Sequence, residues 1–168
     1  MTYIYSINKR ANAKCNIYYG ASATIGTDEP ITYSSQDTSL TTSFTLSKSG
    51  SQFTIPSDGA AYYLEASICY YYNGIAVNNH AIIQWYDITN SSYVGTKGIV
   101  TSGLNPAEGR SGEIVGDEAA RFVTDQSNIY ELRLLSYTGS LSDIDTPSSR
   151  LTSSNPFVQS RCLIWRYV

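Results

Sequence analysis

This chain of 168 residues contains few of the residues that support catalysis or metal binding. One histidine, His80, excludes a site built on two histidines, and no nucleophile elbow, phosphate-binding glycine loop or HExxH sequence supports single-histidine catalysis. Cys15, Cys69 and Cys162 are odd in number and widely spaced, which suits neither a disulfide framework nor a zinc site. We therefore expect reduced, buried cysteines, no cofactor and no enzyme activity.

Paired acids offer one alternative to that expectation. Asp143 and Asp145 stand two residues apart in a loop rich in Ser, Asp and Pro, and such a pair can bind calcium or act in a glycosidase. Calcium loops need more oxygen ligands in close register, and a carboxylate pair becomes catalytic only through tertiary placement. We expect these two residues to be solvated loop acids.

Charge and long apolar runs are also scarce. Charged residues make up 15% of the chain and the net charge is −3, so no global attraction to nucleic acid is expected. No apolar run of about 20 residues occurs, which predicts no membrane span. The first 15 residues, MTYIYSINKRANAKC, do not follow the order of a signal peptide. We expect synthesis in the cytoplasm of a host cell and release by lysis or inside a particle.

The residues that are abundant favour β-structure. Ser and Thr together number 40, and Tyr outnumbers Phe by fifteen to four. Alternation with period two dominates the regular stretches, with turn residues about every 8–12 positions, which is typical of a sandwich or barrel. The stretch 104–116 is expected to be a Gly-rich loop or a broken hairpin. Strands are predicted at 43–47, 51–57, 62–72, 80–89, 118–125, 128–139 and 159–168.

The strand predicted at 62–72 has large side chains on both faces. One face is expected to point into the core, because the other face contains Glu65. The core face comprises Tyr62, Leu64, Ala66, Ile68, Tyr70 and Tyr72. The opposite face comprises Tyr63, Glu65, Ser67, Cys69 and Tyr71.

The order of these segments resembles a known family. The pattern F-T-I-P-x-x-G-x-x-Y-x-L-x-A-S, from Phe53 to Ser67, resembles the opening strands of the trimeric jelly rolls related to tumour necrosis factor and the complement globular heads. The same fold occurs in bacteriophage and viral fibres and head-decoration proteins. YELRLLSYTGS and the closing SRCLIWRYV are similar to the family's habit of ending in an apolar strand at the sheet centre. The resemblance covers about residues 43–168.

The resemblance implies an all-β, antiparallel, two-sheet jelly-roll sandwich that assembles as a homotrimer. A jelly-roll domain at 41–168 would follow an irregular N-terminal segment at 1–40. Tyrosine provides a large contact area at low entropic cost, so a strand with Tyr on both faces suits contact with a sister subunit. We expect Tyr63, Ser67 and Tyr71 in the subunit interface; the alternative is a solvated sheet face. Trp85 and Trp165 lie in apolar strands and are expected in the core or interface rather than stacked on a sugar.

The segment 1–40 is predicted to be an arm that anchors the protein, and the alternative is that it supplies additional edge strands. Its first 27 residues carry basic side chains and no acid, so they could meet an acidic shell surface. The expected anchoring residues are Tyr3, Tyr5, Lys9, Arg10 and Lys14.

Together these features predict a structural protein of a virion, most simply a bacteriophage. A trimeric jelly roll would decorate or stabilise the capsid at the particle surface through contacts with itself and with other virion proteins. The alternative is a fibre or adhesin module that binds a receptor or a host-surface glycan, with loops such as 90–98 and 140–156 making the contact.

Overall fold

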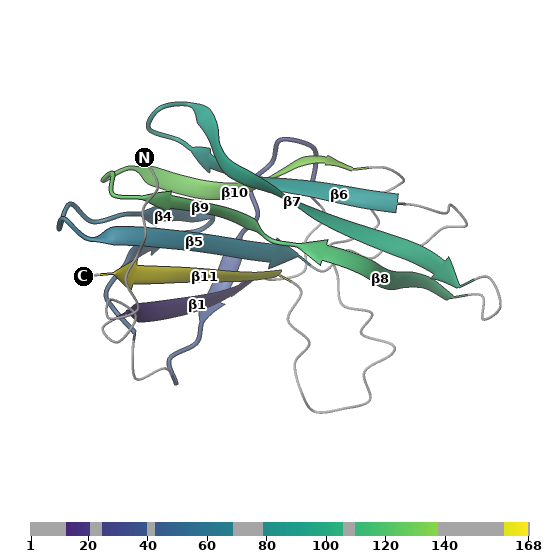
Figure 1. The fold of residues 1–168 in the computed structure, drawn as a ribbon, viewed down its shortest axis with the longest axis horizontal. Helices are drawn as coiled ribbons and strands as arrows, with labels where there is room; N and C mark the ends of the chain where they lie inside the picture. The colour runs from purple at the N-terminus through teal and green to yellow at the C-terminus, as the bar shows by residue number, and fades with distance from the viewer. Residues whose placement is uncertain are drawn as a thin grey trace.

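A computed structural model describes residues 13–20, 25–39, 43–68, 79–105, 110–137 and 160–167. These residues form β-strands joined by turns, and none of them forms a helix able to cross a membrane. The strands, labelled in Figure 1, are β1 (Lys14–Gly20), β2 (Tyr33–Gln36), β3 (Ser47–Ser49), β4 (Gln52–Thr54), β5 (Ala61–Ile68), β6 (Asn79–Asp87), β7 (Ser92–Asn105), β8 (Arg110–Glu118), β9 (Ala120–Thr124), β10 (Ile129–Tyr137) and β11 (Ser160–Tyr167).

The strands form one antiparallel sheet that curls on itself. Its order is β2-β1-β11-β5-β9-β7-β6-β10-β4-β3, with β8 paired to β7. We call β2-β1-β11-β5-β9 the first half and β7-β6-β10-β4-β3, with β8, the second half. The expected all-β antiparallel class is confirmed. The division into two separate sheets stays a prediction, because a single residue pair, Thr96 with Arg121, joins β7 to β9.

The two halves pack against each other through aromatic side chains. The ring of Tyr18 on β1 lies 4.9 Å from that of Phe53 on β4, and Trp85 on β6 lies 5.7 Å from Phe122 on β9. Trp85 is fully buried, as the sequence predicts for it. Truncating a buried aromatic of this size typically costs about 3–5 kcal/mol, so this aromatic layer is a main source of stability.

Burial alternates along β5 as its sequence predicts. Tyr62, Leu64, Ala66 and Ile68 are buried, whereas the residues between them are half-buried. The predicted core face is therefore confirmed over β5, while Tyr70 and Tyr72 lie outside the described residues. The apolar strand β11 lies between β1 and β5, which confirms its expected central position in the sheet.

The chain passes from the second half to the first half at Ala119. Strand β8 runs beside β7, and β9 continues from it to pair with β5 (Figure 1). A side chain at Gly98 would lie 2.6 Å from both the Glu118 carbonyl and the Ala120 nitrogen, so the close approach of β7 to this corner requires glycine. The Trp85 indole donates a 3.1 Å hydrogen bond to the Ala120 carbonyl, which holds the corner from the core side.

The described part of the segment 1–40 belongs to the same sheet. Strand β1 pairs with β11, and β2 pairs with β1. Between them the chain crosses to β10 of the second half, where the Ile31 amide donates to the Leu132 carbonyl at 2.8 Å and the Leu134 amide donates to the Glu29 carbonyl at 3.1 Å. Residues 1–12 lie outside the described part of the chain. Ile25, Ile31 and Tyr33 of this segment are buried in the core.

Candidate functional site

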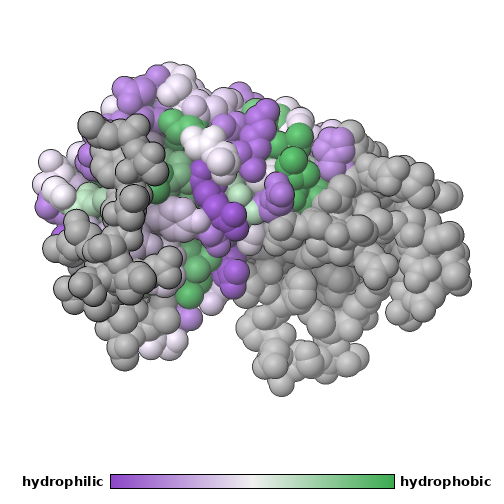
Figure 2. Space-filling model, viewed as in Figure 1, coloured by the Kyte–Doolittle hydropathy of each residue, from purple (hydrophilic) through white to green (hydrophobic). Residues whose placement is uncertain are grey.

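The outward surface of the first half carries large apolar side chains. We call the surface of β1, β11, β5 and β9 that points away from the second half the outer face. In Figure 1, β9, β5, β11 and β1 lie one below another, and Figure 2 shows hydrophobic residues among polar and pale ones on the surface seen from that side. One cross-strand row of this face consists of Cys15, Trp165, Tyr63 and Val123.

Three of the four side chains in this row are only partly covered in the single chain, and the fourth, Cys15, is buried. Trp165 and Tyr63 are half-buried, and Val123 is 55% exposed, the larger of the two values among the exposed large hydrophobic side chains of the described residues. Covering such groups is favourable, so a row of them on one surface is a feature of surfaces that contact another molecule.

The next row contains an ion pair between two opposed strand positions. It consists of Ile17, Leu163, Glu65 and Arg121. The Arg121 guanidinium donates to the Glu65 carboxylate through Nε at 2.9 Å, and the Tyr63 hydroxyl donates to the same Glu65 oxygen at 2.8 Å. Glu65 therefore ties together a residue from its own strand and one from the neighbouring strand.

The two donors to Glu65, the Tyr63 hydroxyl and the Arg121 guanidinium, keep their protons at neutral pH. Burial, followed by the hydrogen bond to Glu65, raises the pKa of the Tyr63 hydroxyl to about 12. The bond to Glu65 also raises the pKa of the Arg121 guanidinium. Tyr63 thus stays a neutral donor and Arg121 stays charged. The group is a structural network rather than an acid–base pair.

The structure places two of the predicted interface residues on the outer face. Tyr63 and Ser67 point outward from β5 and are half-buried, whereas Tyr71 lies outside the described residues. Of the predicted anchoring residues, only Lys14 is described; it is exposed at the start of β1, opposite Arg166. The other four, Tyr3, Tyr5, Lys9 and Arg10, lie outside the described residues, as do Asp143 and Asp145.

Two further outer-face residues, Leu163 and Val123, are not among the interface residues expected from the sequence, whereas Trp165 is expected in the core or the interface. Leu163 and Trp165 lie in RCLIWRY, where apolar residues occupy both alternating sets, which is the pattern of a strand covered on two sides. That pattern was sufficient to find them. Val123 lies in the short strand β9, where no alternating pattern of apolar residues marks it. Its outward position follows from the pairing of β9 with β5.

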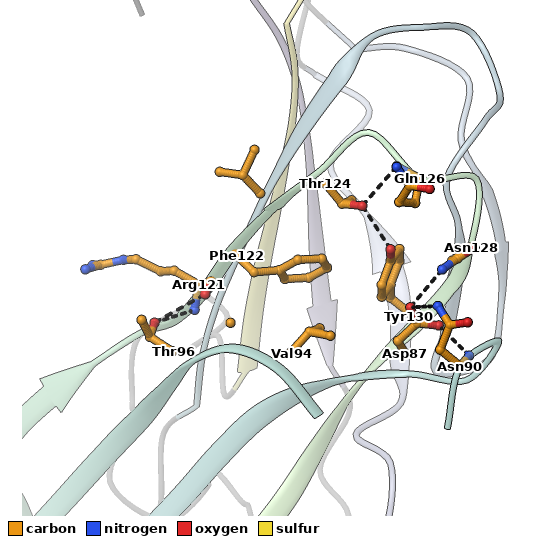
Figure 3. A pocket seen from close by; sticks show the side chains of 12 residues that line it. Asp87, Asn90, Val94, Thr96, Arg121, Phe122, Thr124, Gln126, Asn128 and Tyr130 are labelled. Carbon is orange, nitrogen blue, oxygen red and sulfur yellow. Dashed lines mark hydrogen bonds between the residues drawn. The ribbon is translucent and has the colours of Figure 1, made fainter. Parts of the chain in front are cut away.

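A pocket of about 520 Å³ lies where β7 and β9 separate beyond the Thr96–Arg121 pair (Figure 3). Val94 on β7, Phe122 on β9 and Tyr130 on β10 form its apolar part. Its polar end is formed by the last residue of β6 and by residues of two turns: Asp87, Asn90, Gln126 and Asn128.

The polar groups of this pocket bond to one another. The Asp87 carboxylate accepts from the Asn90 amide nitrogen at 3.0 Å, from Asn90 Nδ2 at 2.9 Å and from Asn128 Nδ2 at 2.8 Å, while Thr124 and Tyr130 share a 2.9 Å hydrogen bond. Burial alone would raise the pKa of Asp87, but these bonds lower it overall. Asp87 is therefore an ionised group that joins two turns and is not poised for proton transfer.

The described residues contain no group of three or more His, Cys, Asp or Glu side chains arranged to hold a metal ion. Cys15 and Cys162 are buried free thiols; burial raises the pKa of Cys15 to about 11 and raises that of Cys162 strongly. Neither thiol is a ready nucleophile at neutral pH. The outer face is thus the described feature best suited to contact with another molecule.

No protein-family model matches the chain, and no curated protein matches it in sequence.

Proposed function

We propose that the chain is a structural subunit that assembles as a homotrimer through its outer face. The observation that carries this proposal is the row of Trp165, Tyr63 and Val123, three large side chains aligned across neighbouring strands and left partly exposed in the single chain. Tyr and Trp are enriched at protein interfaces because they combine apolar area with a polar group that tolerates partial wetting.

The dimensions of the outer face suit a second copy of the chain. Its four strands stand about 4.8 Å apart, and the two central ones are eight residues long, so the face covers on the order of 500 Å². In a three-fold ring the outer face of one copy meets a different surface of the next copy, and an interface that buries such an area on both sides reaches the ~1,000 Å² total expected of a specific contact.

The charges of the face also favour contact between identical chains. Glu65 and Arg121 neutralise each other within the face, and Arg161 in the row of Tyr19 and Ser67 adds one positive charge, so two copies can approach through this face despite the net charge of −3 of each chain. Three copies close into a ring when each offers one surface to the next, which removes any open end for further growth.

The strand order supports a jelly roll as the fold of this subunit. Four strands of the first half, β1-β11-β5-β9, face four of the second half, β4-β10-β6-β7, and a jelly roll has eight strands in two such sheets. Successive strands also alternate between the halves from β4 onward, apart from the hairpin β6–β7 and the attached β8. The short strands β2 and β3 extend the two edges.

The place of the trimer is proposed to be the surface of a virion, as the resemblance in residues 43–168 implies. There it would stabilise or decorate a capsid through protein contacts.

The proposal is tested by purifying particles from the source and measuring this chain in them by quantitative mass spectrometry, together with a glycan array on the purified protein. We expect a fixed copy number that is a multiple of three and no glycan binding. Particles without the chain, or selective glycan binding, would contradict the proposal in favour of a secreted binding module.

A further inference from the structure

We infer that the Glu65–Arg121 ion pair, held by Tyr63, determines the register in which copies of this chain meet. This inference rests on the proposed trimer and concerns the same outer face. The pair lies near the centre of that face: Glu65 lies between Leu163 and Arg121 in its cross-strand row, and Tyr63 lies between Trp165 and Val123 in the next. A third charged residue, Arg161, lies in the row on the other side, opposite Ser67.

The geometry of the pair is well defined even in the single chain. Glu65 and Arg121 occupy directly opposed positions on β5 and β9, and the Arg121 backbone is bonded in both directions to the Thr96 hydroxyl at 3.2 Å. Tyr63 holds the carboxylate from the other side. Both ends of the ion pair are therefore oriented before any partner arrives, which reduces the entropic cost of using them in an interface.

The pair contributes little to the stability of the isolated chain. The Arg121 side chain is 53% exposed and that of Glu65 is 27% exposed, and exposed ion pairs are weak because water and salt screen them. Once a second copy covers the face, the same pair loses its water. Breaking it then leaves an unpaired charge in a buried place. The pair uses Nε of Arg121 and one oxygen of Glu65, so a neighbour in a displaced register also leaves the other guanidinium N–H groups and the second carboxylate oxygen buried without partners.

Apolar residues alone would not select one arrangement. Trp165, Leu163 and Val123 gain from burial in almost any orientation, because the hydrophobic effect has no direction. A polar group within an apolar contact surface can select a single register and a single oligomeric state. Glu65 and Arg121 supply that group on the outer face.

The experiment measures oligomeric state and its concentration dependence by native mass spectrometry and analytical ultracentrifugation on the full chain. Three variants are compared with the unchanged protein: Glu65→Gln, the double variant Glu65→Leu/Arg121→Leu, and Asp28→Asn. The last is a matched control, because Asp28 pairs with Arg133 at 3.3 Å on the second half, away from the outer face. Near-ultraviolet circular dichroism at low concentration verifies that each variant is folded.

We expect Glu65→Gln to raise the concentration at the dissociation midpoint at least tenfold, which for a trimer is a 100-fold change in the dissociation constant, or about 2.8 kcal/mol per trimer. Asp28→Asn should leave the midpoint unchanged. The double leucine variant should associate but populate several oligomeric states. A Glu65→Gln variant with an unchanged midpoint, or a double leucine variant that forms only trimers, overturns the role of the ion pair but leaves the proposed trimer in place. An unchanged protein that is monomeric at every concentration overturns the proposed trimer and the inference together.

Discussion

Tyr63 and Trp165 occupy directly opposed positions on β5 and β11, and both side chains point away from the core. Their neighbours in the same row are Val123 on β9 and Cys15 on β1. The inner faces of the same strands are already filled by buried residues such as Tyr62 and Ile164. The strands β5 and β11 therefore have apolar side chains on both faces, as do strands that are covered on both sides.

Replacing Val123 by aspartate should prevent assembly without unfolding the chain. Val123 is 55% exposed, so a charged side chain at this position remains in water in the single chain but loses that water in an assembly. We expect the midpoint of dissociation, measured by analytical ultracentrifugation, to rise at least about tenfold. Ile99→Asp is the matched control, because Ile99 is 38% exposed on β7, outside the outer face, and should leave assembly unchanged. Equal effects of the two substitutions would argue against the outer face as the interface.

Replacing Gly95 by alanine should destabilise the fold more than replacing Gly59 does. The two glycines have almost the same backbone angle, φ +73° and φ +72°, so the left-handed strain of about 1–2 kcal/mol is common to both. At Gly95 the added methyl group would overlap the Arg121 carbonyl and the Phe122 Cβ, whereas at Gly59 it would meet nothing within 4 Å. Overpacking of this kind typically costs another ~1–3 kcal/mol. Urea unfolding of both variants measures the difference, and equal free energies of unfolding would show that β7 and β9 are not in close contact.

Acid should destabilise the chain partly through Asp87. Burial alone would raise the pKa of this carboxyl, but hydrogen bonds from Asn128, Asn90 and the Thr89 backbone lower it below its usual value of about 3.9. A carboxyl whose pKa is lower in the folded chain than in the unfolded chain stabilises the fold when the pH is above its pKa in the unfolded chain. This contribution to the free energy of unfolding is lost as the pH falls through its pKa in the folded chain.

The free energy of unfolding should therefore decrease as the pH falls below about 4, and less steeply in Asp87→Asn than in the unchanged protein. Asp28, Asp37 and Asp58 also have lowered pKa values, so part of the slope remains in the variant. Chemical unfolding between pH 7 and pH 2.5 measures the slope. An exposed acid, Asp125, provides the control substitution Asp125→Asn, and a variant slope equal to that control would contradict the role of Asp87.

The buried thiols should resist alkylation in the folded chain. Burial raises the pKa of Cys15 from 9.0 to about 11, which lowers its thiolate fraction roughly 100-fold near pH 8, and Cys162 is fully buried. Peptide mapping after brief treatment with N-ethylmaleimide should find both residues unmodified in native protein and modified in urea. Rapid labelling of either residue without denaturant would show that its strand opens readily.

Local alternation was sufficient to predict the central strands of this fold. Glu65 marks the outward face of β5, and the alternation around it places Tyr62 and Leu64 in the core, as the structure does. The predicted strands at 80–89 and 128–139 correspond to β6 and β10 within two residues.

Tertiary contacts determine the parts that alternation did not predict. In β1, the polar residue Asn16 is fully buried because its side chain bonds to both the amide and the carbonyl of Phe44, so KCNIYYG shows no simple alternation. The predicted strand 118–125 is divided at Ala119, where the chain changes from one half to the other beside Gly98. The pairing of Glu65 with Arg121 joins residues 56 positions apart, and no local pattern indicates it.

Native mass spectrometry of the full chain at micromolar concentration is the most direct test of whether the chain forms a trimer through its outer face. The outer face of β1, β11, β5 and β9 leaves Trp165, Tyr63 and Val123 partly uncovered in a single chain, and a trimer covers them. We expect one dominant species of about 55 kDa, three times the 18.5 kDa of the chain. A species of 18.5 kDa that persists up to the highest soluble concentration would contradict it.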